Sequence, residues 1–187
     1  MANTNDAAMV ATGKPKVGGA IFHAPLGSKV PTDATTALDA AFKCMGYCSE
    51  DGLTNALSIS GGSIKAWGGE TVHNYEDGFS NAFKFKLIEI LNVEVLKAVY
   101  GAENVTGDLE NGIHVKVTGQ PHEDGVWVVD MVMNGYAKRI VVPCAKITAV
   151  GEILYKDNTV AGYDTTISAT PDAEGVYHHE YISKPAA

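Results

Sequence analysis

Residues 126–142 read VWVVDMVMNGYAKRIVV, and this stretch decides the fold. Trp127, Val129 and Met131 point to one side of an extended chain, and Val126 and Val128 point to the other, since side chains alternate along a strand. Asn134-Gly135 is a strong signal for a two-residue hairpin turn. The pattern therefore predicts an antiparallel hairpin whose first strand is apolar on both faces. Such a strand is expected to be central in its sheet and covered on both sides.

Further strands are expected on both sides of this hairpin, because apolar residues alternate in several short segments bounded by turn residues. These segments are residues 20–24, 53–59, 83–88, 113–117, 147–150, 152–155, 160–169 and 176–182. The return strand of the hairpin is expected to end at Pro143, and Ser49 to Gly52 is expected to form a turn. Many short antiparallel strands predict a mainly β protein, a β-sandwich or barrel.

Two helices are expected beside these strands. Asn92 can cap a helix in which Val93, Leu96 and Val99 follow helical spacing, and Gly101 can end it. A helix this short does not hold alone, so it should flank the sheet. A second, brief helix is expected from Thr32 towards Phe42.

Residues 60–81 form an unusually long connection, punctuated by Gly61-Gly62 and Gly68-Gly69. Connections in compact domains are commonly about 4–6 residues, and longer ones are usually functional or disordered. The apolar residues of this segment argue against simple disorder; they are Ile64, Trp67, Val72 and Tyr75. Two interpretations remain open: the segment folds back over one end of the core, or it protrudes and docks on a neighbouring subunit.

The chain has 187 residues and a net charge of −8. The length predicts one domain, residues 18–187, preceded by a flexible polar arm, residues 1–17. Arg139 is the only arginine and no basic stripe is visible, so tight nucleic-acid binding is not expected. An apolar run long enough for a membrane span and a signal peptide are both missing, so no membrane partner is expected. The odd count of three cysteines predicts free thiols in a reducing compartment.

The sequence contains no convincing catalytic site. No phosphate-binding glycine loop and no Gly-x-Ser-x-Gly motif occur. Glu50-Asp51 and Glu123-Asp124 each adjoin a glycine, where acids are common in turns. The six histidines are scattered, whereas a zinc site needs two close pairs of ligands. We therefore expect no enzyme activity, no metal and no cofactor.

Several stretches, in this order, resemble one protein family. They are GAIF at 19–22, APLG at 24–27, PTDA at 31–34, GY at 46–47, SEDGL at 49–53, IKAWGG at 64–69, FKF at 83–85, LNV at 91–93, LKAVYG at 96–101, GY at 162–163 and ATPD at 169–172. Together they are similar to the major tail protein, or tail tube protein, of long-tailed non-contractile bacteriophages.

The resemblance implies a β-sandwich of the phage tail tube type, with one flanking α-helix and a long protruding loop that reaches neighbouring subunits or rings. It also implies a virion protein, made in the host cytoplasm, that self-assembles into stacked hexameric rings. Double-stranded DNA passes through this tube during ejection without specific binding. The implied partners are other copies and other tail proteins: the tape measure, the tail terminator and the distal tail protein. An acidic lumen would repel DNA and let it slide.

Four residues of the 113–142 region are candidates for lumen-facing or edge-strand positions: His114, Lys116, Asp130 and Asn134. The alternative function is a β-sandwich module that binds carbohydrate or a host surface. Aromatic rings can stack on sugars, and Trp67, Tyr75 and Tyr136 are candidates for exposure. The two functions differ in whether Trp67 serves assembly or ligand binding.

Overall fold

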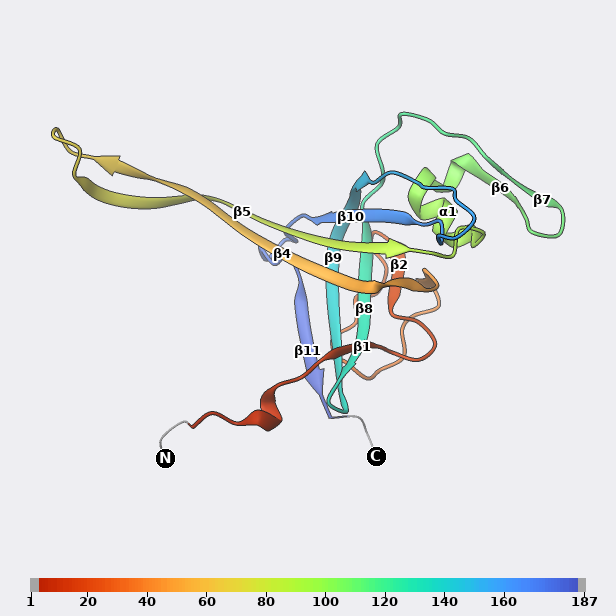
Figure 1. Cartoon of the computed structure of the whole chain (residues 1–187), viewed down its shortest axis with the longest axis horizontal. Coiled ribbons are helices and arrows are strands. Elements are labelled where there is room, and N and C mark those ends of the chain that lie inside the picture. Colours follow the sequence, from red (N-terminus) through yellow and green to blue (C-terminus); the bar gives the residue numbers. More distant parts are fainter. Residues whose placement is uncertain (1–3, 185–187) are drawn as a thin grey trace.

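The computed structural model describes residues 4–184, so the first three residues of the predicted arm and the last three of the predicted domain lie outside it. One nine-stranded antiparallel sheet dominates the fold. Seven of its strands follow the order β3-β2-β8-β9-β10-β5-β4, while β1 pairs with β8 and β11 with β9. Figure 1 shows β4, β5 and β10 running across the direction of β8, β9 and β11. The mainly β, antiparallel fold with one flanking helix and a long protrusion is thus confirmed.

The bounds of the elements follow the chain. The strands of the main sheet are β1 (Gly13–Pro15), β2 (Ile21–Pro25), β3 (Lys43–Cys44), β4 (Cys48–Lys65), β5 (Thr71–Leu87), β8 (Gly125–Met133), β9 (Tyr136–Val150), β10 (Tyr163–Ala169) and β11 (His179–Ser183). The small second sheet pairs β6 (Val105–Asp108) with β7 (Gly112–Val115). The helices are α1 (Val93–Tyr100) and the short 3-10 turns η1 (Ala7–Met9) and η2 (Ala102–Asn104).

The β8–β9 hairpin lies at the centre of the sheet, as its sequence predicts. Asn134 adopts a positive φ of 48°, and the strands pair from Met133 opposite Tyr136 onwards. One side of β8 contributes Trp127 and Val129 to a core that also contains Val95, Leu96 and Val99 of α1. The other side contributes Val126 and Val128 to a second apolar cluster, under residues 30–42. The hairpin is therefore covered on both faces.

Strand β9 does not end at Pro143, as expected, but continues to Val150. Register shifts in this part of the hairpin, where Trp127 faces Val142 but Gly125 faces Ala145. A β-bulge is one of the few places in a sheet that accepts proline, because the ladder is already interrupted there. Before the bulge β9 pairs with β11, and after it with β10, so Pro143 marks the change of neighbour.

The helix α1 begins and ends where the sequence predicts. The Asn92 side chain accepts a hydrogen bond from the Glu94 amide at 3.0 Å, and Gly101 follows with a φ of 93°. The second predicted helix, Thr32 to Phe42, does not form. The Asp33 carboxylate instead accepts bonds from the amides of Thr35 and Thr36, which holds the segment in turns.

Two smaller expectations of secondary structure, for residues 49–52 and 152–155, are corrected. Residues 49–52 form no free turn but a bulge inside β4, between Cys48 and Leu53. Residues 152–155 form no strand. Within the arm, Gly13–Pro15 pairs with Met131–Met133 of β8, so the main chain ties this part to the sheet. All three cysteines are free thiols.

Candidate assembly surface

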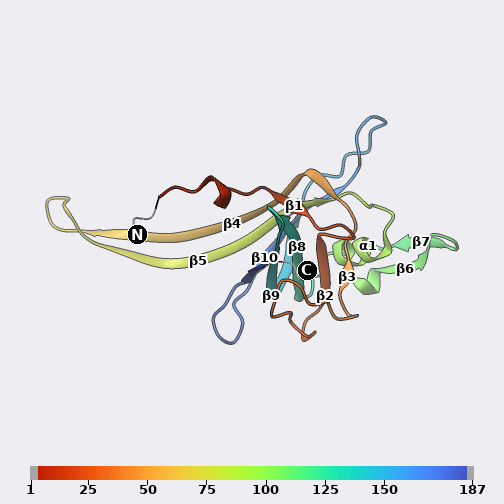
Figure 2. The ribbon, with the colours of Figure 1, turned by 90° about the horizontal axis from the view of Figure 1, so that it is seen from below.

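The most prominent surface feature is the hairpin formed by β4 and β5, which we call the long hairpin. Figures 1 and 2 both show it extending far from the sheet, on the side opposite α1, β6 and β7. Its strands pair from Leu53 opposite Phe85 out to Lys65 opposite Thr71. The segment that the sequence left open as a cover or a protrusion is therefore a protruding ribbon.

Pairing of the long hairpin with the rest of the main sheet ends at Ala82. From Ala82 to Leu87, β5 pairs with β10 on its second side, and Phe83, Phe85 and Leu87 are buried. Beyond this point β5 has only β4 as a strand neighbour, and every residue of β5 from Thr71 to Ser80 is exposed. The outer part of the ribbon thus stands in solvent on both faces in the single chain.

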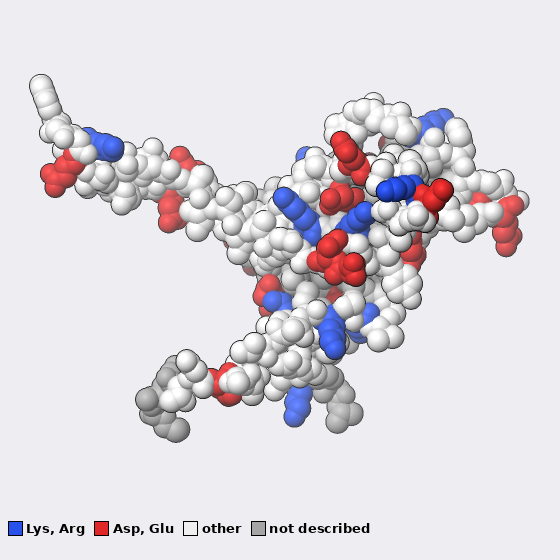
Figure 3. All heavy atoms as spheres, viewed as in Figure 1, with Lys and Arg blue, Asp and Glu red and all other residues white. Residues whose placement is uncertain are grey.

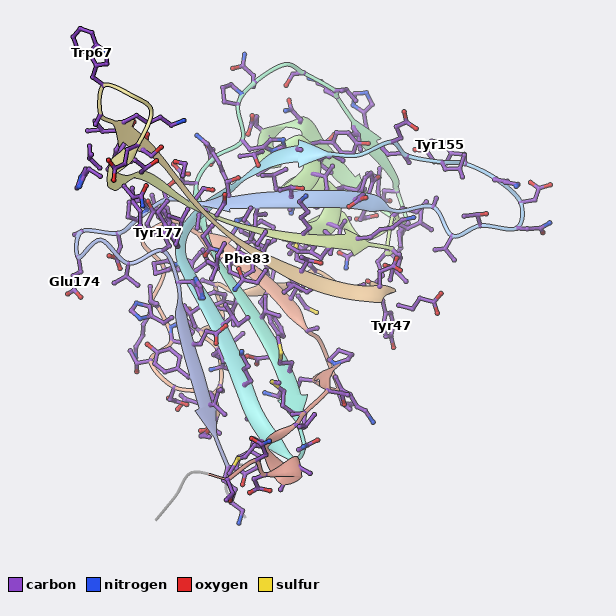
Figure 4. All side chains as sticks on the ribbon, turned by 60° about the vertical axis from the view of Figure 1, so that its left-hand side comes forward. Tyr47, Trp67, Phe83, Tyr155, Glu174 and Tyr177 are labelled. Carbon is purple, nitrogen blue, oxygen red and sulfur yellow. The ribbon has the colours of Figure 1, made fainter. Side chains whose placement is uncertain are left out.

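Exposed apolar side chains line the outer ribbon. The four that the sequence singled out for docking, Ile64, Trp67, Val72 and Tyr75, all lie on it, and all are exposed. Leu57, Ile59 and Phe79 add to them nearer the sheet. Trp67 has no shielding from the rest of the chain, and Figure 4 shows its side chain projecting beyond the hairpin tip. Figure 3 shows few charged side chains along the ribbon between its tip and the body.

Local sequence explains how the ribbon turns and twists. At the tip, the Ala66 amide donates to the Glu70 carbonyl at 2.7 Å, and Gly68 and Gly69 both adopt positive φ. Midway, the register shifts between Ser60 and Gly61. A Cβ at Gly61 would collide with the backbone of the facing strand, so only glycine fits this bulge.

Polar side chains clamp the base of the ribbon. Asn81 is buried, and its amide nitrogen donates to Asn55 on β4 at 2.6 Å. Its amide oxygen lies 2.7 Å from Nδ1 of His178, a residue just before β11. Burial lowers the pKa of His178, and because an amide oxygen can only accept, Nδ1 is the donor in this bond. Tyr177 packs edge-on against Phe79 next to this clamp, so the ribbon leaves the sheet in a defined direction.

A scan against protein families finds a match over residues 1–186, to the family described as phage tail tube protein. The chain belongs to this family. No curated protein matches it. Family membership makes the chain a structural protein of the phage virion, in the tail, and implies a non-enzymatic role.

Within residues 4–184, no three His, Cys, Asp or Glu side chains are placed to hold a metal ion. The one α-helix of that range spans eight residues, and none there is long and apolar enough to cross a membrane.

The four candidate lumen or edge residues of the tail tube chain lie in two separate places, at β7 and on the β8–β9 hairpin. His114 is exposed on β7, which belongs to the small sheet rather than the main one, and Lys116 is exposed just after the end of β7. Asn134 is exposed at the β8–β9 turn, and its side chain donates to the Val10 carbonyl at 2.6 Å. Asp130 is only 3% exposed. Its side chain therefore does not face solvent in the single chain.

Asp130 instead belongs to an internal network that the sequence analysis missed. The only arginine, Arg139, is equally buried and binds both oxygens of the Asp130 carboxylate. Its remaining nitrogen donates to the carbonyls of Asp33, at 3.1 Å, and Thr36, at 2.8 Å. The Asn134-Gly135 turn carries the signal that could have revealed the pair, since a two-residue loop there places residues 130 and 139 opposite each other.

Proposed function

We propose that the chain assembles with copies of itself into stacked hexameric rings that form the tail tube, the conduit for DNA ejection. One observation carries the proposal: beyond Ala82 the long hairpin pairs with no other strand of residues 4–184, yet it exposes Ile64, Trp67, Val72 and Tyr75. A two-stranded ribbon is marginally stable in water on its own. A partner that covers these side chains removes apolar surface from water and holds the ribbon in place.

The partner is another copy of the chain, since a tube is built from many identical subunits. In this assembly the long hairpin bridges from one subunit to the next, within a ring or between rings. Exposed main-chain edges, such as the outer edge of β4, are then available for pairing or covering between subunits.

Charge supports the role as a conduit. Each chain carries a net charge of −8, so six copies at −8 each bring 48 excess negative charges to a ring. If part of this charge lines the bore, double-stranded DNA is repelled from the wall on all sides and slides without binding. At its ends, the tube meets the other tail components: the tape measure protein inside, the tail terminator and the distal tail protein.

Electron microscopy of the purified chain, at high protein concentration and with the tail partners present, tests the proposal. We expect rings or tubes. A matched variant replaces residues 61–77 with Asn-Gly, which joins the paired residues Ser60 and Gly78 through a two-residue turn. This variant keeps the buried base of β5 and should fold, but it should form no tubes. A wild-type chain that stays monomeric under all of these conditions would contradict the proposal.

A further inference from the structure

The end of the molecule opposite the hairpin tip carries an open apolar depression. Its lining comes from the consecutive residues Ile88 to Val93 and from Leu109 of the β6–β7 turn; we call it the Leu91 depression. Leu91 and Leu109, which are 62% and 66% exposed, both present apolar surface to solvent in this depression. Nothing else in residues 4–184 covers this surface.

Glu89 gives the Leu91 depression a polar contact point. One carboxylate oxygen accepts from the Tyr47 amide and the other from the Asn92 side chain, each at 2.9 Å. These bonds fix the carboxylate in position. A carboxylate has about four lone-pair positions, so acceptor capacity remains. Glu89 is also the one charged residue that lines the depression.

The hairpin tip offers matching chemistry. The Trp67 indole supplies a large apolar face and one N–H donor, and nothing within residues 4–184 covers it. Lys65, two residues before Trp67, and Glu70, three residues after it, are the two charged residues between Ile64 and Val72. An apolar ring, a donor and a positive charge on the tip thus correspond to apolar walls and a carboxylate in the Leu91 depression.

The tip and the Leu91 depression cannot meet within one chain. Figures 1 and 2 place the tip of the long hairpin at one end of the longest axis and α1 toward the other end. Residues 88–93 of the Leu91 depression lead directly into α1, which begins at Val93. Any contact between them must join two copies. Such a contact is heterologous, because it leaves one tip and one depression free at the two ends of a pair, and so it repeats until a ring closes or a filament grows.

We propose that the Trp67-bearing tip of one copy docks into the Leu91 depression of another. The indole packs against Leu91 and Leu109, and Lys65 pairs with Glu89, while Glu70, on the other side of the turn, stays in solvent. This inference rests on the proposed self-assembly and adds the surface that receives the hairpin.

Cysteine cross-linking tests the contact. Ala66→Cys and Leu91→Cys are prepared as separate variants, one with a mass tag, then mixed under assembly conditions and oxidised. We expect a disulfide-linked dimer of the two variants, roughly tenfold above that from Ala66→Cys mixed with Tyr155→Cys. Tyr155, which lies on a different loop, is 73% exposed and so at least as accessible as Leu91. Wild-type chain, whose thiols are partly buried, gives the background.

The outcomes separate this inference from the proposed function. Tubes that form without the 66–91 cross-link would overturn the docking contact and leave self-assembly standing. Chains that never assemble would overturn both. A charge test is independent of cysteines: Lys65→Glu should raise the protein concentration needed for assembly roughly tenfold, and Glu70→Lys should not. Equal effects of these two substitutions would contradict the pairing of Lys65 with Glu89.

Discussion

Asp130 and Arg139 face each other across the β8–β9 hairpin as a buried two-point ion pair, with Nε 2.6 Å from Oδ1 and Nη2 2.8 Å from Oδ2. Lys16, from the segment after β1, approaches the same carboxylate at 3.4 Å. Through its bonds to the Asp33 and Thr36 carbonyls, Arg139 also holds residues 33–36 over the sheet. One guanidinium therefore links the central hairpin to the segment that covers it.

Removing one partner of this ion pair should destabilise the folded chain. Arg139→Met leaves the Asp130 carboxylate buried without its main partner, and we expect a loss of about 3–5 kcal/mol in the free energy of unfolding, measured by urea denaturation. The double variant Asp130→Leu with Arg139→Met buries no charge and should recover much of that loss. A single variant as stable as the wild type would show that the pair does not hold the fold.

The sequence predicted local features well. The Asn134-Gly135 turn and the Asn92 cap act over a few neighbouring residues, so their patterns need no knowledge of the rest of the chain. The prediction of a helix from Thr32 towards Phe42 was wrong. The Asp33 side chain binds the Thr35 amide, and Arg139, more than a hundred residues away, binds the Asp33 carbonyl, so these groups hold the segment in turns.

Features that depend on pairing between strands distant in the sequence could not be predicted from local patterns. The length of the long hairpin follows from cross-strand bonds between residues with no regular apolar alternation, such as Ser58 opposite Ser80. Continuation of β9 past Pro143 depends on a bulge that only pairing with β8 creates. For the candidate site, the exposed apolar residues of the long hairpin could be named from sequence, but the Leu91 depression forms only when Leu109 is folded next to residues 88–93.

Acid should weaken the fold through His23. Burial lowers the pKa of His23 from 6.5 to about 4, with a smaller opposing effect from Glu94. The unfolded chain therefore binds more protons than the folded one between pH 6.5 and 4, and stability falls as pH falls through that window. We expect a loss of up to about 3 kcal/mol from this group.

Thermal and urea unfolding across that pH range measure the effect. His23→Gln, which does not titrate, should show a flatter dependence between pH 6.5 and 4 than the wild type. The aspartates with lowered pKa, such as Asp33 and Asp172, titrate below that window and should affect both proteins equally. Identical pH profiles for the two proteins would contradict the prediction.

The clamp at Asn81 should control the motion of the long hairpin. Asn81→Ala removes the bonds to Asn55 and His178 and leaves their polar atoms unpaired, which should cost about 1–3 kcal/mol in stability. Amide hydrogen exchange should rise along the outer ribbon more than in β8. Asn74→Ala, an exposed change on the same strand, is the matched control and should alter neither quantity. Unchanged exchange in Asn81→Ala would show that the clamp does not restrain the ribbon.

Trp67 separates a tube subunit from a module that binds carbohydrate or a host surface. Its side chain contacts nothing that stabilises the single chain, so Trp67→Ala should change the free energy of unfolding by less than about 0.5 kcal/mol. In a tube subunit, loss of this anchor should raise the protein concentration needed for assembly at least roughly tenfold, measured by sedimentation and microscopy. Tyr136→Ala, another exposed aromatic change but away from the long hairpin, should leave assembly intact. If Trp67→Ala assembles normally and instead loses binding to a glycan array, the exposed indole serves recognition of a host surface, and the long hairpin is not what joins the subunits.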